Sequence, residues 1–134
     1  MSGVVALSHP ALLEFWRERH LCTFTTLRKD GSPHVVAVGA TLDADAGLCR
    51  VISSSLSAHV RHIRNGAEQV AICQVDGPRW ATIEGLAEVR DDPASVSCGE
   101  RWYAARYRTP RPNPARVVIE ISVTKVLGSS AFRG

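Results

Sequence analysis

Residues 23–64 constrain the fold more than any other part of the chain. Two runs rich in threonine and valine flank the tetrapeptide Lys29-Asp30-Gly31-Ser32. Asp-Gly is a strong hairpin signal, because glycine readily adopts the positive φ that such a turn needs. A second turn, another apolar run and a short basic helix follow. The order strand, turn, strand, turn, strand, helix is therefore predicted, and the rest of the chain has to pack around it.

Six strands and three helices are predicted along the whole chain. The strands are 21–28, 33–42, 48–53, 68–76, 79–89 and 116–127, and the helices are 9–20, 57–65 and 93–108. Short turns between strands, with helices inserted singly, favour a small antiparallel barrel of the α+β class, mainly β. Residues 1–134 form one domain by size. So many strands in so short a chain leave apolar surface that a second copy would cover, so a homodimer is expected.

The positive charge is carried almost entirely by arginine. The net charge is +3, and Lys29 and Lys125 are the only lysines. The arginine fork suits carboxylates, phosphates and flat rings, so the balance fits a multiply anionic small molecule. No recognition helix or basic stripe indicates a nucleic-acid partner. There is no long apolar run and no secretory signal, so no membrane partner is expected and the default location is cytoplasmic.

Familiar catalytic motifs are missing from the chain. No GxGxxG, GxxxxGK[ST], HExxH or GxSxG pattern occurs. The four cysteines lack the spacing of a zinc or redox site, and His59 and His62 have no carboxylate near them to complete a metal site. No catalytic residue and no metal ligand is therefore assigned. If the protein is an enzyme, a bound cofactor carries the chemistry.

Hydroxyls and positive charge gather around the helix predicted at 57–65. The group consists of Ser53, Ser54, Ser57, His59 and Arg61. Two interpretations stay open: a serine-rich loop that caps a helix, or a phosphate cradle at the helix start. His34, beside the hairpin, is either a half-exposed strand-end residue or part of a cofactor cleft.

Arginines and aromatic residues also crowd the Pro-rich stretch after the helix predicted at 93–108. The late helix and this stretch together contain Arg101, Arg106, Arg108, Arg111 and Arg116, with Trp102, Tyr103 and Tyr107. One interpretation is a solvated helix face. The other is a surface that grips a flat molecule with acidic arms.

Several stretches resemble the pyridoxamine-phosphate-oxidase-like split barrels, a superfamily that binds flavins or deazaflavins. The shared pattern is TLRxDGxPHVVxV followed by a strand that ends in hydroxyl residues. CQVDGPRW, IEGLAEV and RYRTPRPNPARVVIEI resemble a narrower branch, the actinobacterial reductases that use coenzyme F420, particularly the F420-dependent biliverdin reductases. The likeness covers about residues 8–128.

The resemblance implies a six-stranded split β-barrel that forms a homodimer with two cofactor clefts between the subunits. Coenzyme F420 is the implied cofactor and FMN the alternative, with the ring along residues 34–38 and the phosphate near the serines. The implied cofactor-binding residues are His34, Val35, Val36, Ala37, Val38, Ile52, Ser53, Ser54, Ser57, His59, Arg61, Gln74 and Trp80. Relatives usually carry lysine where His59 stands and often asparagine where His62 stands. Phosphate binding is therefore expected to be weaker or more pH-sensitive here.

The implied reaction is hydride transfer from reduced F420 to a conjugated acceptor, with biliverdin giving bilirubin. Its propionates and ring plane would be bound by Arg79, Arg108, Arg111, Arg116 and Tyr107. Reduction of a quinone or enone, an FMN-binding flavoprotein, and a non-catalytic F420- or haem-binding protein remain the alternatives.

Overall fold

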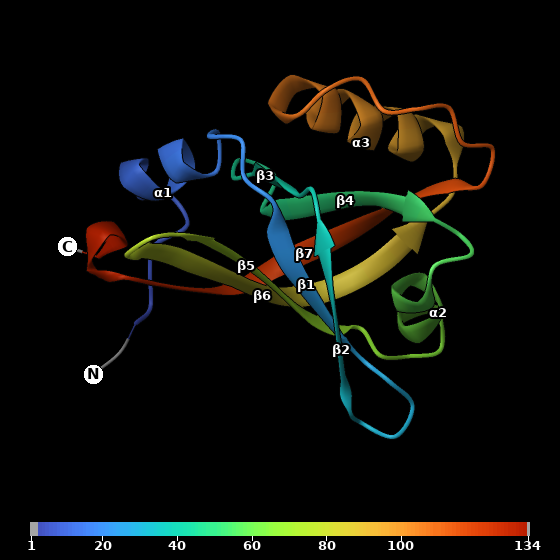
Figure 1. The fold of residues 1–134 in the computed structure, drawn as a ribbon, viewed down its shortest axis with the longest axis horizontal. Helices are drawn as coiled ribbons and strands as arrows, with labels where there is room; N and C mark the ends of the chain where they lie inside the picture. The colour runs from blue at the N-terminus through green and yellow to red at the C-terminus, as the bar shows by residue number, and fades with distance from the viewer. Residues whose placement is uncertain (1–2, 134) are drawn as a thin grey trace.

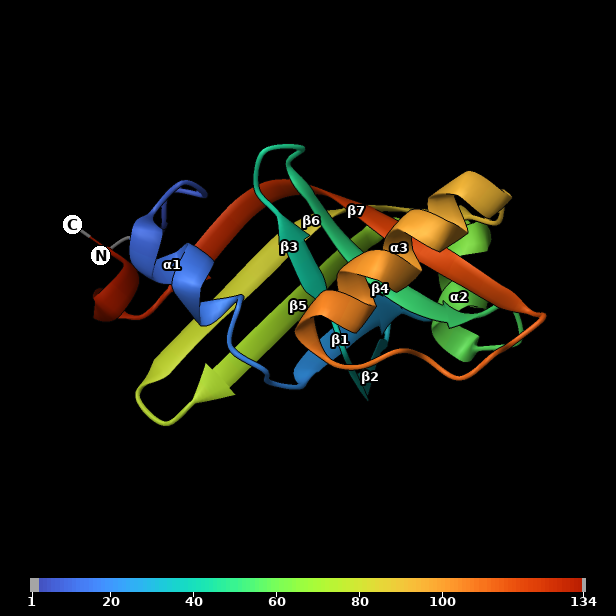
Figure 2. The same ribbon diagram turned by 90° about the horizontal axis from the view of Figure 1, so that it is seen from above.

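A computed structural model describes residues 3–133 of the chain. Its elements are α1 (Pro10–Phe15), β1 (Cys22–Leu27), β2 (Pro33–Val38), β3 (Thr41–Asp43), β4 (Leu48–Ser54), α2 (Ala58–Arg64), β5 (Gln69–Asp76), β6 (Arg79–Arg90), α3 (Pro93–Arg106), β7 (Arg116–Gly128) and the 3-10 helix η1 (Ser130–Phe132). The strands form one antiparallel sheet in the order β2-β1-β5-β6-β7-β4-β3. Figure 1 shows α1 and α2 at opposite ends of this sheet, and Figure 2 shows α3 lying across β4.

The two edge strands of the sheet, β2 and β3, are consecutive in the chain. Only Gly39 and Ala40 separate them, so the sheet has to curl until its first and last strands meet at this corner. The mainly β, antiparallel fold class is therefore confirmed, but the sheet has seven strands instead of six. The stretch 33–42, expected to be one strand, bends at Gly39. A Cβ on Gly39 would lie 2.8 Å from the Tyr103 ring and 3.0 Å from the Tyr107 ring.

The β1–β2 hairpin forms where the Asp-Gly signal predicts it. Arg28 N–H donates to the Ser32 carbonyl at 2.8 Å, and Gly31 N–H donates to the Arg28 carbonyl at 2.8 Å. Gly31 has φ of 85°, which is the left-handed conformation that a three-residue hairpin loop places at its last position. The resulting register sets Thr26 opposite His34.

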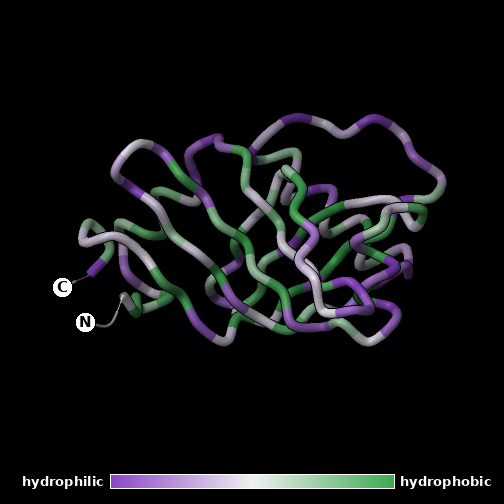
Figure 3. Tube along the Cα trace, turned by 60° about the horizontal axis from the view of Figure 1, so that its bottom comes forward, coloured by the Kyte–Doolittle hydropathy of each residue, from purple (hydrophilic) through white to green (hydrophobic). Residues whose placement is uncertain are grey.

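One face of the curled sheet covers the core, together with α1 and α2. The largest fully buried side chains include Leu12, Phe15, Phe24, Val60, Ile72, Ile83 and Ile119. On β2, Val36 and Val38 pack against this core, while Val35 and Ala37 lie on the exposed face. Figure 3 shows the hydrophobic and hydrophilic stretches along the chain trace.

The helices differ in how well their sequence predictions hold. α3 begins at Pro93, with the Asp92 side chain accepting from Ser95 N–H at 3.0 Å, as the prediction for 93–108 requires. α1 is much shorter than the predicted 9–20 and ends at Phe15, because the chain turns there toward β1. No helix within residues 3–133 has the length and apolar character needed to span a membrane.

Gly85 marks a bulge in β6, and we predict that a methyl group at this position destabilises the fold. A Cβ on Gly85 would collide with the Ser122 carbonyl oxygen and lie 2.6 Å from Ile121 Cγ2. Gly85→Ala is expected to lower the free energy of unfolding by about 1–3 kcal/mol in a denaturant titration. Gly3→Ala is the control, since its Cβ would meet only the Gly128 carbonyl oxygen at 3.7 Å. Equal stability of the two variants would contradict this account of the bulge.

Candidate functional site

Three imidazoles converge between β2 and α2, and we call His34, His59 and His62 the histidine cluster. The ring centroids of His34 and His62 are 5.0 Å apart, and those of His34 and His59 are 6.5 Å apart. His34 comes from the middle of the β1–β2 hairpin, and the other two come from α2. Their spacing in α2 places both on the side of the helix that faces the sheet.

Hydroxyl groups from two strands hold the rings of this cluster. Ser53 Oγ lies 2.7 Å from His59 Nε2 and donates to Ser57 Oγ at 3.1 Å. Thr26 Oγ1 lies 2.9 Å from His62 Nδ1. His34 Nδ1 is buried and has no hydrogen-bond partner among the described residues. The cluster therefore contains an unsatisfied ring nitrogen beside three oriented hydroxyls.

The surroundings of His59 and His62 favour the neutral form of both imidazoles in the absence of an anion. Burial lowers the pKa of His59, and the nearby His34 and His62 lower it further. Burial also lowers the pKa of His62, and so do the charges of His34, Arg28 and Arg61. A bound anion would reverse this balance, because an opposite charge favours the protonated ring.

The loop between β4 and α2 carries the remaining predicted phosphate ligands. Ser57 precedes α2, but its side chain makes no capping hydrogen bond with the helix. Ser54 Oγ accepts from Leu56 N–H at 3.3 Å, and Arg61 Nη1 donates to the Leu56 carbonyl at 2.7 Å. The exposed Arg61 guanidinium therefore lies along the serine loop. Ser53, Ser57 and His59, predicted to act together, do lie together.

The predicted ring-binding strand splits into two faces. Val35 and Ala37 of β2 are exposed, whereas Val36 and Val38 pack against the core. Ile52 of β4 approaches Gly99 of α3, with its Cγ2 3.2 Å from where a glycine Cβ would lie. Only the exposed face of β2 and its free backbone edge are therefore open to a ligand.

Gln74 and Trp80 lie away from the histidine cluster. The Gln74 side chain is fully buried; its amide nitrogen donates to the Phe15 carbonyl at 2.8 Å, and its oxygen accepts from Arg106. Trp80 lies near the β5–β6 turn, at the end of the sheet opposite α2 (Figures 1 and 2). The Gln74 amide is therefore not available to a ligand, and Trp80 does not reach the histidine cluster within one subunit.

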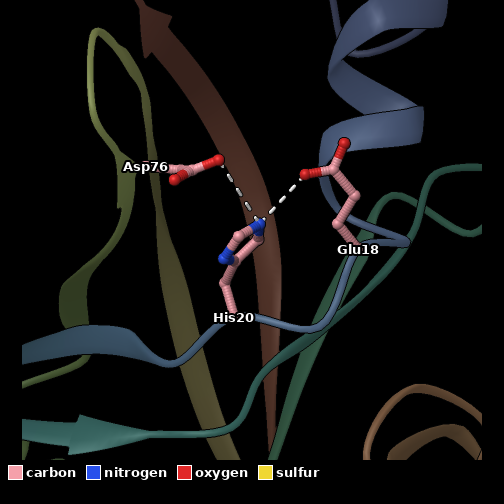
Figure 4. A group of neighbouring side chains, drawn as sticks. All are labelled: Glu18, His20 and Asp76. Atoms are coloured by element: carbon pink, nitrogen blue, oxygen red, sulfur yellow. Dashed lines mark hydrogen bonds and ion pairs between the residues drawn. The ribbon is translucent and has the colours of Figure 1, made fainter.

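Arg79 belongs to an ion-pair network. It forms a bidentate pair with Glu18, at 3.0 and 2.9 Å, and also bonds to Asp76. His20 Nε2 lies 3.0 Å from Glu18 and 3.9 Å from Asp76. Figure 4 shows the His20 ring facing both carboxylates. Glu18, His20 and Asp76 are close enough to surround a cation. The Arg79 guanidinium already neutralises both carboxylates, so this group is an ion-pair network that joins the segment between α1 and β1 to the ends of β5 and β6.

The other predicted substrate residues divide into paired and free groups. Arg116 Nη1 donates to Glu100 at 2.9 Å. The Tyr107 hydroxyl donates to the His20 carbonyl at 2.6 Å and accepts from Ala40 N–H at 3.1 Å. Arg108 and Arg111 are exposed and form no ion pair with the described residues. Of the residues predicted to bind the substrate, only these two arginines have a guanidinium group that is free, within the described part of the chain, to pair with an acidic ligand.

Sequence reasoning grouped Arg106 with its neighbouring arginines but missed its contacts with distant backbone groups and the groove beside it. Arg106 donates to the carbonyls of Glu18 and Ala40 and to Gln74. A groove of about 420 Å³ lies between α1, β3 and α3, lined in part by Trp16, Trp102 and Arg106. Its lining residues come from three distant segments, and no local pattern in the sequence indicates it.

The curled antiparallel sheet, with hydroxyl and imidazole groups gathered at one end, has the architecture of a small β-barrel. The chain belongs to the pyridoxamine 5'-phosphate oxidase family, whose N-terminal domain model matches residues 8–130.

Comparison with curated proteins and solved structures finds close relatives. An F420H2-dependent biliverdin reductase of Mycobacterium tuberculosis (strain CDC 1551 / Oshkosh) is 51% identical over 119 residues, covering 88% of this chain and 85% of the relative. A structure of a conserved hypothetical protein of Mycobacterium tuberculosis superposes with a TM-score of 0.79 at 20% identity, covering 95% of this chain and 87% of that chain. A structure of an F420 reductase superposes with a TM-score of 0.69 at 23% identity, covering 84% of this chain and 93% of that chain.

We predict that the Glu18–Arg79 pair makes stability depend on acid pH. Hydrogen bonds from Arg79 and then His20 lower the pKa of Glu18 from 4.5 to about 2. A carboxylate with a depressed folded-state pKa stabilises the fold above its unfolded-state pKa, and this contribution is lost as pH falls through the folded-state value. Glu18→Gln should therefore flatten the pH dependence of the unfolding free energy between pH 4.5 and about 2.

Glu14→Gln is the matched control, because the Glu14–Arg17 pair lies on the exposed face of α1. Denaturant titrations at several pH values compare the two variants with the wild type. If the unfolding free energy of Glu18→Gln changed with pH as steeply as that of the wild type, the Glu18–Arg79 pair would not be the source of the acid sensitivity.

Proposed function

We propose that this protein is an F420H2-dependent oxidoreductase that transfers hydride to a conjugated acceptor, with biliverdin reduced to bilirubin. The observation that carries the proposal is 51% identity, over most of both chains, to an F420H2-dependent biliverdin reductase. Coenzyme F420 is the proposed cofactor. The family model and the F420 reductase fold neighbour support the same class.

The residues of the site fit the anionic arm of such a cofactor. The hydroxyls of Ser53 and Ser57 and the unpartnered His34 Nδ1 are hydrogen-bonding groups that a phosphate would satisfy. Arg61 adds a permanent positive charge at the edge of the same loop. We propose Ser53, Ser57, His34, His59 and Arg61 as the phosphate-binding residues.

The exposed side of β2 is the proposed wall for the ring. β2 is an edge strand, so the backbone N–H and C=O groups on its outer side are not used by the sheet. Val35 and Ala37 give this wall a flat apolar surface beside Thr23 and Thr25 of β1. When bound, reduced F420 supplies the hydride. The protein's part is to orient the ring and exclude water from the point of transfer.

Arg108 and Arg111 are the proposed partners of the substrate carboxylates. Both are exposed and unpaired among the described residues, unlike Arg79 and Arg116. The Pro-rich segment that follows α3 restricts the backbone next to them. The arginines therefore present their guanidinium groups from a stiff loop, which favours paired recognition of two acidic arms.

A homodimer is proposed on the exposed face of β2, β5 and β6. Val35 is 57%, Val75 59% and Leu86 45% exposed, although each belongs to a strand. A second copy would cover this surface. The cytoplasm is the proposed location, and the four free cysteines suit a reducing compartment.

Binding and turnover test the proposed function directly. Purified protein is titrated with F420 and, in parallel, with FMN, and the oxidation of the reduced cofactor is then followed with biliverdin present. Saturable binding of F420, tighter than that of FMN, and oxidation that depends on biliverdin are expected. Tighter binding of FMN would favour the flavoprotein alternative, and binding without turnover would favour a non-catalytic role.

The substrate assignment predicts a selective defect in the double variant Arg108→Ala/Arg111→Ala. Charge-assisted pairs contribute about 1.5–3 kcal/mol each, so KM for biliverdin should rise at least about tenfold. The dissociation constant of F420 should stay unchanged. Arg101→Ala is the control, because Arg101 is exposed on α3 and donates only to Ser97. An unchanged KM in the double variant would remove these two arginines from the substrate site.

A further inference from the structure

We propose that the histidine cluster is a proton-coupled anion anchor: binding of the cofactor's phosphate arm draws protons onto His59 and His62, which lie beside His34. The inference rests on the proposed function, because it concerns the arm of the same cofactor. It adds a ligand, His62, and a mechanism by which the site responds to pH.

The geometry supplies three adjacent imidazoles and no permanent charge among them. Ser53 holds His59 at 2.7 Å and Thr26 holds His62 at 2.9 Å, so both rings have fixed orientations. The His34 ring lies 6.5 Å from that of His59 and 5.0 Å from that of His62, and its buried Nδ1 has no partner in the described part of the chain. An anion bound among these rings would give this unpaired nitrogen a partner.

The groups around the cluster make protonation costly until an anion arrives. The titratable or charged groups that act on His62 are His34, Arg28 and Arg61. The groups that act on His59 are His34 and His62. Lys29 lines, with His62, a hollow of about 280 Å³ at the hairpin end of the cluster. None of the charged groups that act on either ring is a carboxylate. The anion would be the first negative charge that these rings meet.

This arrangement determines the direction in which the affinity for the anion changes with pH. In the free protein the lowered pKa values of His59 and His62 keep both rings neutral at neutral pH. Anion binding raises those pKa values, so the protonated complex is favoured below the bound-state pKa. Affinity is therefore full at low pH and is lost as pH rises, by about tenfold per pH unit for each coupled proton.

A single calorimetric experiment tests this inference. Oxidised F420 is titrated into the protein at pH values from about 5.5 to about 8, in pairs of buffers with different ionisation enthalpies, which report the protons taken up per ligand. The wild type is expected to take up protons and to lose affinity as pH rises. Any proton that the ligand itself takes up appears equally with every variant, so the difference between variants isolates the protein's share.

Three variants test whether the histidines bind the anion or only stabilise the fold. His59→Lys is expected to bind F420 with a flatter pH profile and fewer protons taken up, because lysine stays charged across this range. His62→Asn, which can still bond Thr26, should also lower the number of protons. His9→Asn is the control; this residue caps α1, far from the cluster, and asparagine is a good cap. It should match the wild type.

The possible results distinguish a failure of the anion anchor from a failure of the proposed function. Saturable F420 binding with the same proton number in the wild type and in both cluster variants would overturn the anchor and leave the proposed function standing. A structural role for the histidines would give this same result, because it changes stability without moving the proton number. No saturable binding of F420 at any pH would overturn the proposed function and the anchor with it.

Discussion

The fold depends on the way the end of α3 holds the corner between β2 and β3. The Tyr107 hydroxyl accepts from Ala40 N–H, and Arg106 donates to the Ala40 carbonyl, so side chains satisfy both backbone polar groups of this corner residue. Arg106 also donates to the Glu18 carbonyl, and Tyr107 donates to that of His20. Because β2 and β3 are the two edges of the sheet, this contact closes the barrel and ties the approach to β1 to the same point.

The histidine cluster is a consequence of that closure. With its end fixed at the corner, β2 runs beside β1 in a register that sets His34 opposite Thr26, and Thr26 contacts His62 of α2. β4 ends at Ser53 and Ser54 and brings the Ser53 hydroxyl to His59 of the same helix. Without long-range polar contacts such as those at the corner, the elements could form separately and leave these side chains apart. The corner brings hydroxyls and imidazoles from four segments into one place.

Local patterns predicted the strands well, because hairpin turns and bulges depend on neighbouring residues. The Asp-Gly signal predicted its turn, whereas the bend at Gly39 was not predicted, since only the rings of Tyr103 and Tyr107 reveal it. In the site, the serines and His59 could be grouped because they lie close in sequence, whereas His34 was placed with them only by the resemblance to the family. Three other predicted site residues have partners that are distant in sequence, so no local pattern could place them. Arg79 pairs with Glu18, 61 residues away. Gln74 bonds to Phe15, 59 residues away, and Tyr107 bonds to His20, 87 residues away.

The central claim is that an anionic cofactor is anchored by the histidine cluster and the serine loop, with its ring along β2. A crystal structure of the protein with F420 bound tests this claim most directly. The account predicts phosphate oxygens within hydrogen-bond distance of Ser53, Ser57 and the imidazoles. F420 with its phosphate in the groove between α1, β3 and α3, and the histidine cluster untouched, would contradict it.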